Sequence, residues 1–264
     1  MGQLNLVRKL ADGSAVEAFI GQHGHSHYLV QLSRPELAAQ ADLLGSFLDT
    51  SRTTASVHHP ELLTPRSFGH GTDGRVWAVS EPITGWTAAD ALRLKGPIPE
   101  ELVVDWGLAV CEALDSLHAR GRVHGCLAPR HLHLWGEPAA PRVRLLDTSL
   151  LYFRGKRSIA LPPGAVLVEP EYLAPERASG SRGTIASDLW GLGVLVVELL
   201  TGRRPFHGAT ADESKQRVLA NSRLVLPPWL KPWQFFVDAC LDPRPLNRFG
   251  SALEARQALI GLLT

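Results

Sequence analysis

Hydrophobic residues in the first third of the chain recur in short runs that turn-forming residues separate. The strand-like runs cover residues 5–9, 15–21, 27–32, 62–69 and 75–81. Residues 35–48 instead place Leu37, Leu43, Leu44 and Phe47 roughly on one face, which predicts a helix. The pattern therefore predicts a small lobe over residues 1–83, with a five-stranded sheet and one helix.

The pattern becomes helical after about residue 84. Apolar positions from 100 to 118 follow the 3.6-residue period, and Pro99 and Gly121 bracket that segment. The most apolar stretch, 189–200, is too short to span a bilayer and indicates a buried core helix. Residues 84–264 therefore predict a larger helical lobe, and the chain as a whole predicts a bilobal α+β fold.

Composition narrows the class of protein. The 264 residues include 27 Lys and Arg against 26 Asp and Glu, and this balance gives no footprint for nucleic acid or an anionic membrane. The chain has three widely spaced cysteines, which suit neither a disulfide framework nor a zinc site. We expect a cytoplasmic protein without a signal peptide or membrane segment.

The helical part carries five spaced motifs. They are HARGRVHGCLAPRH at 118–131, LLDTS at 145–149, PEYLAPE at 170–176, SDLWGLG at 187–193 leading to Pro205-Phe206, and Asp242-Pro243 followed by Arg248. In order and spacing these motifs resemble those of the bacterial eukaryotic-like serine/threonine protein kinases. The resemblance covers essentially the whole chain and implies the bilobal protein-kinase fold.

The same resemblance shows where catalytic residues are replaced. Cys126 occupies the position of the catalytic aspartate, and a thiol, with a pKa of roughly 8.5, substitutes poorly for a carboxylate. Gln31 replaces the lysine that holds the nucleotide phosphates, and Thr50 replaces that lysine's glutamate partner. His131 replaces the magnesium-binding asparagine, and imidazole is a poorer magnesium ligand than an amide oxygen.

The nucleotide groove implied by the resemblance is also altered. Its residues are Ala11, Gly13, Val16, Leu29, Gln31, Ser80, His133 and Asp147. Leu29 stands where a small alanine lies above the adenine ring, and His133 stands where a leucine forms the floor. Gly13 is what remains of three loop glycines that let backbone amides approach phosphates. We therefore expect no cofactor, with ATP and Mg²⁺ binding weak or absent.

Structural anchors of the family are kept. Glu176 and Arg248 are expected to pair across the large lobe, and Asp188 is expected to brace the catalytic-loop backbone. Because the replacements affect the chemistry and leave the scaffold intact, we expect a pseudokinase. Such a domain acts in signalling as a protein-binding, scaffolding or allosteric regulatory module.

Two other functions stay open. The retained Asp147 could still bind a metal, which would support a serine/threonine kinase-like enzyme with residual ATP-dependent phosphotransfer, although an aspartate there can equally bond backbone amides. Alternatively, His131, His133 and Asp147 could form a ligand or metal sensor in the remodelled cleft.

Charge suggests where a partner would bind. Arg154, Lys156 and Arg157 lie in the segment that corresponds to the activation loop of kinases, and residues 148–168 contain no acidic residue. Arginine forms paired hydrogen bonds to carboxylate or phosphate. We expect this loop to accept an acidic or phosphorylated segment of a protein partner, such as an active kinase or another signalling protein.

Overall fold

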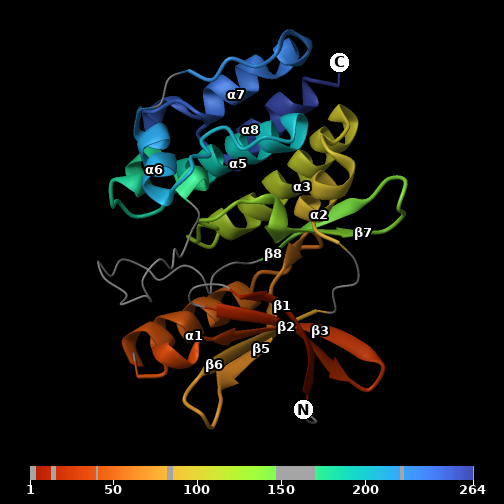
Figure 1. Ribbon diagram of the computed structural model, residues 1–264, viewed down its shortest axis with the longest axis vertical. Helices are drawn as coiled ribbons and strands as arrows, with labels where there is room; N and C mark the ends of the chain where they lie inside the picture. Colours follow the sequence, from red (N-terminus) through yellow and green to blue (C-terminus); the bar gives the residue numbers. More distant parts are fainter. Residues whose placement is uncertain are drawn as a thin grey trace. The chain divides into compact units, whose positions relative to one another are not determined.

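The computed structural model describes residues 4–12, 16–39, 41–81, 86–146, 170–220 and 223–263. These residues form two compact units, each of which is described by itself. The first unit holds the described residues up to position 81 together with Leu146, and the second holds residues 86–145 and those from 170 onward. Figure 1 labels most helices and strands of both units.

The first unit is built on a five-stranded antiparallel sheet. Its strands are β1 (Asn5–Asp12), β2 (Val16–His23), β3 (Ser26–Ser33), β5 (Pro65–His70) and β6 (Val76–Ser80), in the order β1-β2-β3-β6-β5. A two-residue strand, β4 (Leu62–Leu63), precedes β5. Gly24, with a φ of 59°, lies in the tight turn between β2 and β3, where the left-handed conformation favours glycine.

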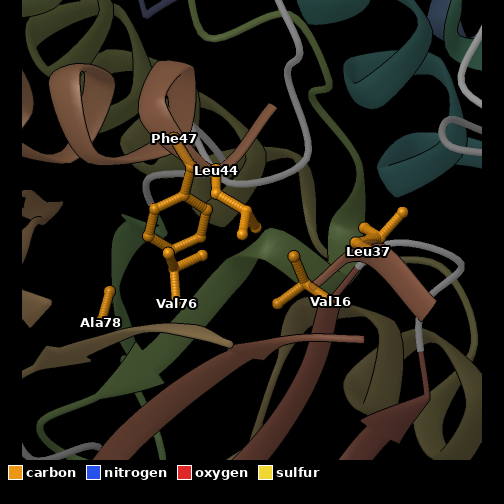
Figure 2. Close-up of a cluster of buried hydrophobic side chains, with 6 residues drawn as sticks. All are labelled: Val16, Leu37, Leu44, Phe47, Val76 and Ala78. Atoms are coloured by element: carbon orange, nitrogen blue, oxygen red, sulfur yellow. The ribbon is translucent and has the colours of Figure 1, made fainter. Parts of the chain in front are cut away.

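One helix, α1 (Ala41–Ala55), packs against β5 and β6. Figure 2 shows Leu44 and Phe47 of α1 lying over Val76 of the sheet, and Val16, Leu37 and Ala78 complete this buried cluster. Burial of these side chains removes apolar surface from water and holds α1 to the sheet.

The bounds predicted for this helix, 35–48, were wrong. Pro35–Leu37 forms a single 3-10 turn, and α1 continues to Ala55. The second half of α1 buries Ser51 and Thr54, which are only 0% and 1% exposed. Because hydroxyl side chains occupy the inward face there, the apolar period ends at Leu48 although the helix does not.

The second unit is mainly helical. Its helices are α2 (Ala88–Lys95), α3 (Glu100–His118), α4 (Pro175–Ala178), α5 (Ile185–Thr201), α6 (Ala211–Ala220), α7 (Gln234–Cys240) and α8 (Ala252–Ile260). Strands β7 (Leu132–Trp135) and β8 (Arg142–Leu146) form an antiparallel hairpin. Short 3-10 turns lie at η2 (Pro129–His131), η4 (Pro170–Tyr172), η5 (Pro228–Trp233) and η6 (Pro245–Asn247).

Helix α5 is the core helix of this unit and contacts α3, α7 and α8 (Figure 1). Thr184 and Ser187 form a capping box at its start, and Gly202 ends it with a φ of 68°. Its Trp190 is fully buried and stacks on Phe206 with ring centroids 5.4 Å apart. The apolar stretch that the sequence placed in a core helix lies within α5.

A strand-rich unit and a helical unit together confirm the predicted α+β architecture. Within the described part of the chain, no helix combines the length and apolar character needed to cross a membrane.

Candidate functional site

Helix α5 holds the loop between α3 and η2 in place through the side chain of Asp188. Asp188, near the start of α5, is 1% exposed and accepts hydrogen bonds from the backbone N–H groups of His124 and Gly125, at 2.8 and 2.7 Å. The same carboxylate lies 2.8 Å from Nε2 of His118 at the end of α3. Three bonds to one buried carboxylate fix the loop backbone and also join it to α3.

Cys126 follows directly in this loop and has a buried side chain, 3% exposed. Nη2 of Arg130 lies 3.9 Å from its Sγ. A thiol at this place can accept a weak hydrogen bond, but it cannot supply the carboxylate oxygens that orient a substrate hydroxyl in kinases.

His131, in η2, has both of its ring nitrogens engaged. Nδ1 donates to the carbonyl oxygen of Cys126 at 2.7 Å, and Nε2 accepts from Nε of Arg130 at 3.2 Å. Burial, together with the positive charge of Arg130, holds the pKa of His131 well below its usual range. The ring is therefore neutral, and its one lone pair is directed at Arg130.

His133, in β7, is also neutral at physiological pH. Burial lowers its pKa to about 4, against a smaller opposing effect of Asp90. Its backbone forms a bridge with Thr87, and its cross-strand neighbour on β8 is Arg144.

In the first unit, Gln31 lies in the middle of β3, between Ala18 of β2 and Ala78 of β6. It is 4% exposed, and none of the described residues donates a hydrogen bond to its Oε1. The position that the resemblance gives to a phosphate-binding ammonium group therefore carries a buried, uncharged amide.

Leu29, two residues earlier on β3, is 2% exposed and packs against Leu63 and Leu146. Val16 at the start of β2 and Ser80 at the end of β6 are buried as well. Leu29 thus occupies volume that an alanine at this position would leave open.

Several predicted site residues fall outside these descriptions. Ala11 lies in β1 and Thr50 in α1, but the structure describes neither side chain. The residues outside the described part of the chain are Gly13, Asp147, Arg154, Lys156 and Arg157.

The other two anchor residues meet in the second unit. Arg248 is fully buried and donates from Nη1 and Nη2 to the two carboxylate oxygens of Glu176, each at 2.8 Å. Ser187 donates a further bond to Glu176, and the Arg248 guanidinium lies 5.1 Å from the centroid of the Trp190 ring. Burial by itself raises the pKa of Glu176, but the bonds from Arg248 and Ser187 outweigh it and lower the pKa.

The sequence reasoning missed Arg130, which bridges Cys126 and His131. It also missed the buried bond between the Tyr172 hydroxyl and Glu198, which is 2.6 Å long. The Arg130 contacts depend on the 3-10 turn η2. Because η2 has only three residues, it leaves no periodic pattern in the sequence from which these contacts could be predicted.

Comparison with known proteins identifies the fold. The sequence model of the family described as the protein kinase domain matches residues 46–259. The chain belongs to the protein kinase domain family. Serine/threonine-protein kinase Pkn1 of Myxococcus xanthus is 28% identical over 274 residues, covering 98% of this chain and 38% of that protein. PknB of Mycobacterium leprae is 25% identical over 246 residues, covering 89% of this chain and 39% of that protein.

Solved structures agree on the fold. The crystal structure of the PknI kinase domain of Mycobacterium tuberculosis superposes with a TM-score of 0.73 at 22% identity, covering 99% of this chain and 96% of that one. The chain spans 25% of pkn2 and 38% of Pkn1 of Myxococcus xanthus, and 39% of PknB, so it covers well under two thirds of the length of these curated relatives. The relatives are named serine/threonine-protein kinases, and kinases use ATP and Mg²⁺.

Proposed function

We propose that this kinase domain is a pseudokinase, which acts in signalling by binding a protein partner and does not transfer phosphate. The observation that carries the proposal is the closed hydrogen-bond arrangement of the loop: His131 bonds the Cys126 carbonyl with one nitrogen and Arg130 with the other. A magnesium ion here would require the ring to give up the Arg130 bond and would then meet the Arg130 charge.

Charge at the other positions supports the same proposal. Phosphoryl transfer requires a carboxylate near the substrate hydroxyl and cations on the nucleotide phosphates. The loop from His124 to His131 contains no carboxylate, and Gln31 brings no positive charge. These residues do not fit the usual magnesium–ATP site, and the Leu29 side chain adds a steric obstacle above the adenine position.

Nucleotide binding tests the proposal. Titration calorimetry with ATP, with and without Mg²⁺, is expected to give no measurable heat of binding at micromolar concentrations. A magnesium-dependent Kd below about 10 μM, roughly −7 kcal/mol, would contradict the proposed loss of the nucleotide site.

The partner side of the proposal rests on the basic segment with Arg154, Lys156 and Arg157. We propose that it binds an acidic or phosphorylated segment of the partner. Arg154→Glu combined with Arg157→Glu is expected to weaken binding to a phosphorylated acidic peptide and to leave the melting curve unchanged. Unaltered peptide binding by the double variant would exclude this segment as the docking surface.

A further inference from the structure

A pocket of about 350 Å³ lies in the second unit, at the start of α3. Its lining comes from three places in the sequence, namely α3, η5 and the turn that follows α8. The lining residues are Glu100, Glu101, Val104, Pro232, Leu262 and Leu263, together with Trp233. This volume is at the lower end of the range for ligand pockets, and it suits one long side chain with part of its backbone.

Two carboxylates, Glu100 and Glu101, line the pocket. Glu100 accepts a hydrogen bond at 2.7 Å from Nε1 of Trp233, a bond that ties the carboxylate to the pocket wall. Glu101 is exposed, and within the described ranges no lysine, arginine or histidine pairs with either carboxylate. The pocket therefore carries two negative charges without a described counter-charge.

The remaining wall is apolar. Val104, Pro232, Leu262 and Leu263 all line the pocket, and Leu263 is 59% exposed although it is a large hydrophobic residue. A pocket lined by two carboxylates and by aliphatic side chains complements a side chain with a charged head and an aliphatic stem. Lysine and arginine have this construction, because their stems pack on apolar surface while their heads stay near charge or water.

An anionic ligand is disfavoured at the same place. The N-terminus of a helix attracts anions through its free N–H groups. At α3, however, the first turn already carries Glu100 and Glu101, so a bound anion would meet two like charges.

We propose that this pocket binds a lysine or arginine side chain presented by a basic segment of a partner protein. Charge complementarity favours a cationic side chain over an anionic ligand, and the apolar lining residues add contact area for the aliphatic stem. The proposal is independent of whether the domain transfers phosphate, since the pocket lies wholly within the second unit and shares no residue with the catalytic loop.

The test uses a fluorophore-labelled peptide of alternating leucine and lysine, with a second peptide in which norleucine replaces each lysine. Fluorescence anisotropy is measured with the wild-type chain, with Glu101→Lys and with Glu137→Lys. Glu137 is an exposed carboxylate in the β7–β8 loop, outside the pocket, and provides a matched change of net charge.

Glu101→Lys is expected to weaken binding of the lysine peptide about tenfold or more, while Glu137→Lys leaves it within about twofold. Binding of the norleucine peptide is expected to be weak and the same for all three proteins. Methyl NMR signals of Leu262 and Leu263 are expected to shift when the lysine peptide is added to the wild-type chain.

Three results would overturn the proposal: no binding of the lysine peptide by the wild-type chain, equal weakening by the two charge reversals, or unchanged Leu262 and Leu263 signals during binding. If Glu101→Lys lowers the melting temperature, Glu101→Gln replaces it. This variant removes the charge without changing the shape of the side chain. It is expected to weaken binding of the lysine peptide at least threefold, and unchanged binding would contradict the proposal.

Discussion

Arg248 and Glu176, 72 residues apart in the sequence, form a two-bond ion pair that joins the start of α4 to the segment before α8. Arg248 also donates to the carbonyl oxygens of Asp242 and Ala186, so it joins the α7–α8 connection to the starts of α4 and α5. Because the guanidinium is fully buried, its charge depends on these partners for compensation.

Loss of this pair is expected to destabilise the domain. Glu176→Ala would leave the Arg248 charge buried with only carbonyl acceptors, at a cost of about 3 kcal/mol in the free energy of unfolding. Urea unfolding followed by tryptophan fluorescence measures this cost. Arg217→Ala, which removes an exposed pair with Glu213, serves as the control and should leave the midpoint nearly unchanged. An equal midpoint for Glu176→Ala and the wild-type chain would mean that the pair does not stabilise the fold.

The neutral His133 predicts a dependence of stability on pH. Its pKa is about 4 in the folded domain and roughly 6.5 in the unfolded chain, so the unfolded chain binds more protons between these values. The stabilisation from this residue is complete above pH 6.5 and is lost as the pH falls toward 4. Between pH 7 and pH 4.5 the loss amounts to roughly 2–3 kcal/mol.

His133→Leu is expected to remove this part of the acid sensitivity. The measurement is the free energy of unfolding at pH 7 and pH 4.5 for both proteins, with the exposed His25→Leu as the control. If the wild-type chain and His133→Leu lose the same stability on acidification, His133 is not held neutral by burial.

Packing of Leu29 predicts a third effect. Leu29→Ala removes a side chain that is 2% exposed from its cluster with Leu63 and Leu146. The cavity is expected to cost about 2–5 kcal/mol in the free energy of unfolding. Leu6→Ala, at an exposed position in β1, should change it by less than about 0.5 kcal/mol.

The same variant separates steric from electrostatic effects on nucleotide binding. Leu29→Ala is expected to remain without measurable ATP binding in calorimetry, because Gln31 still supplies no charge for the phosphates. Recovery of ATP binding in this variant would show that the Leu29 side chain alone closes the site.

The family-like motifs and the hydrophobic patterns together predicted most of the fold. The short apolar runs of strands and the 3.6-residue period of helices both indicate which face of an element is buried. The prediction failed at α1, where Ser51 and Thr54 are buried in place of apolar residues and so leave no period to detect. At the candidate site, the resemblance of the motifs predicted from sequence position alone which catalytic residue types are replaced, and this stays a prediction. The hydrogen bonds of these residues could not be predicted, since Arg130 reaches His131 and Cys126 only because η2 turns the chain back.

Phosphate transfer itself is the most direct test of the account. The wild-type chain and Asp147→Asn are incubated with γ-labelled ATP and Mg²⁺ or Mn²⁺, with generic protein substrates and without them, and incorporated label is counted. Because the loop carries no carboxylate and Gln31 carries no positive charge, the label incorporated with either protein is expected to equal the background of a no-enzyme control. Incorporation above background in the wild-type chain that Asp147→Asn abolishes would contradict the account and establish the domain as an active kinase.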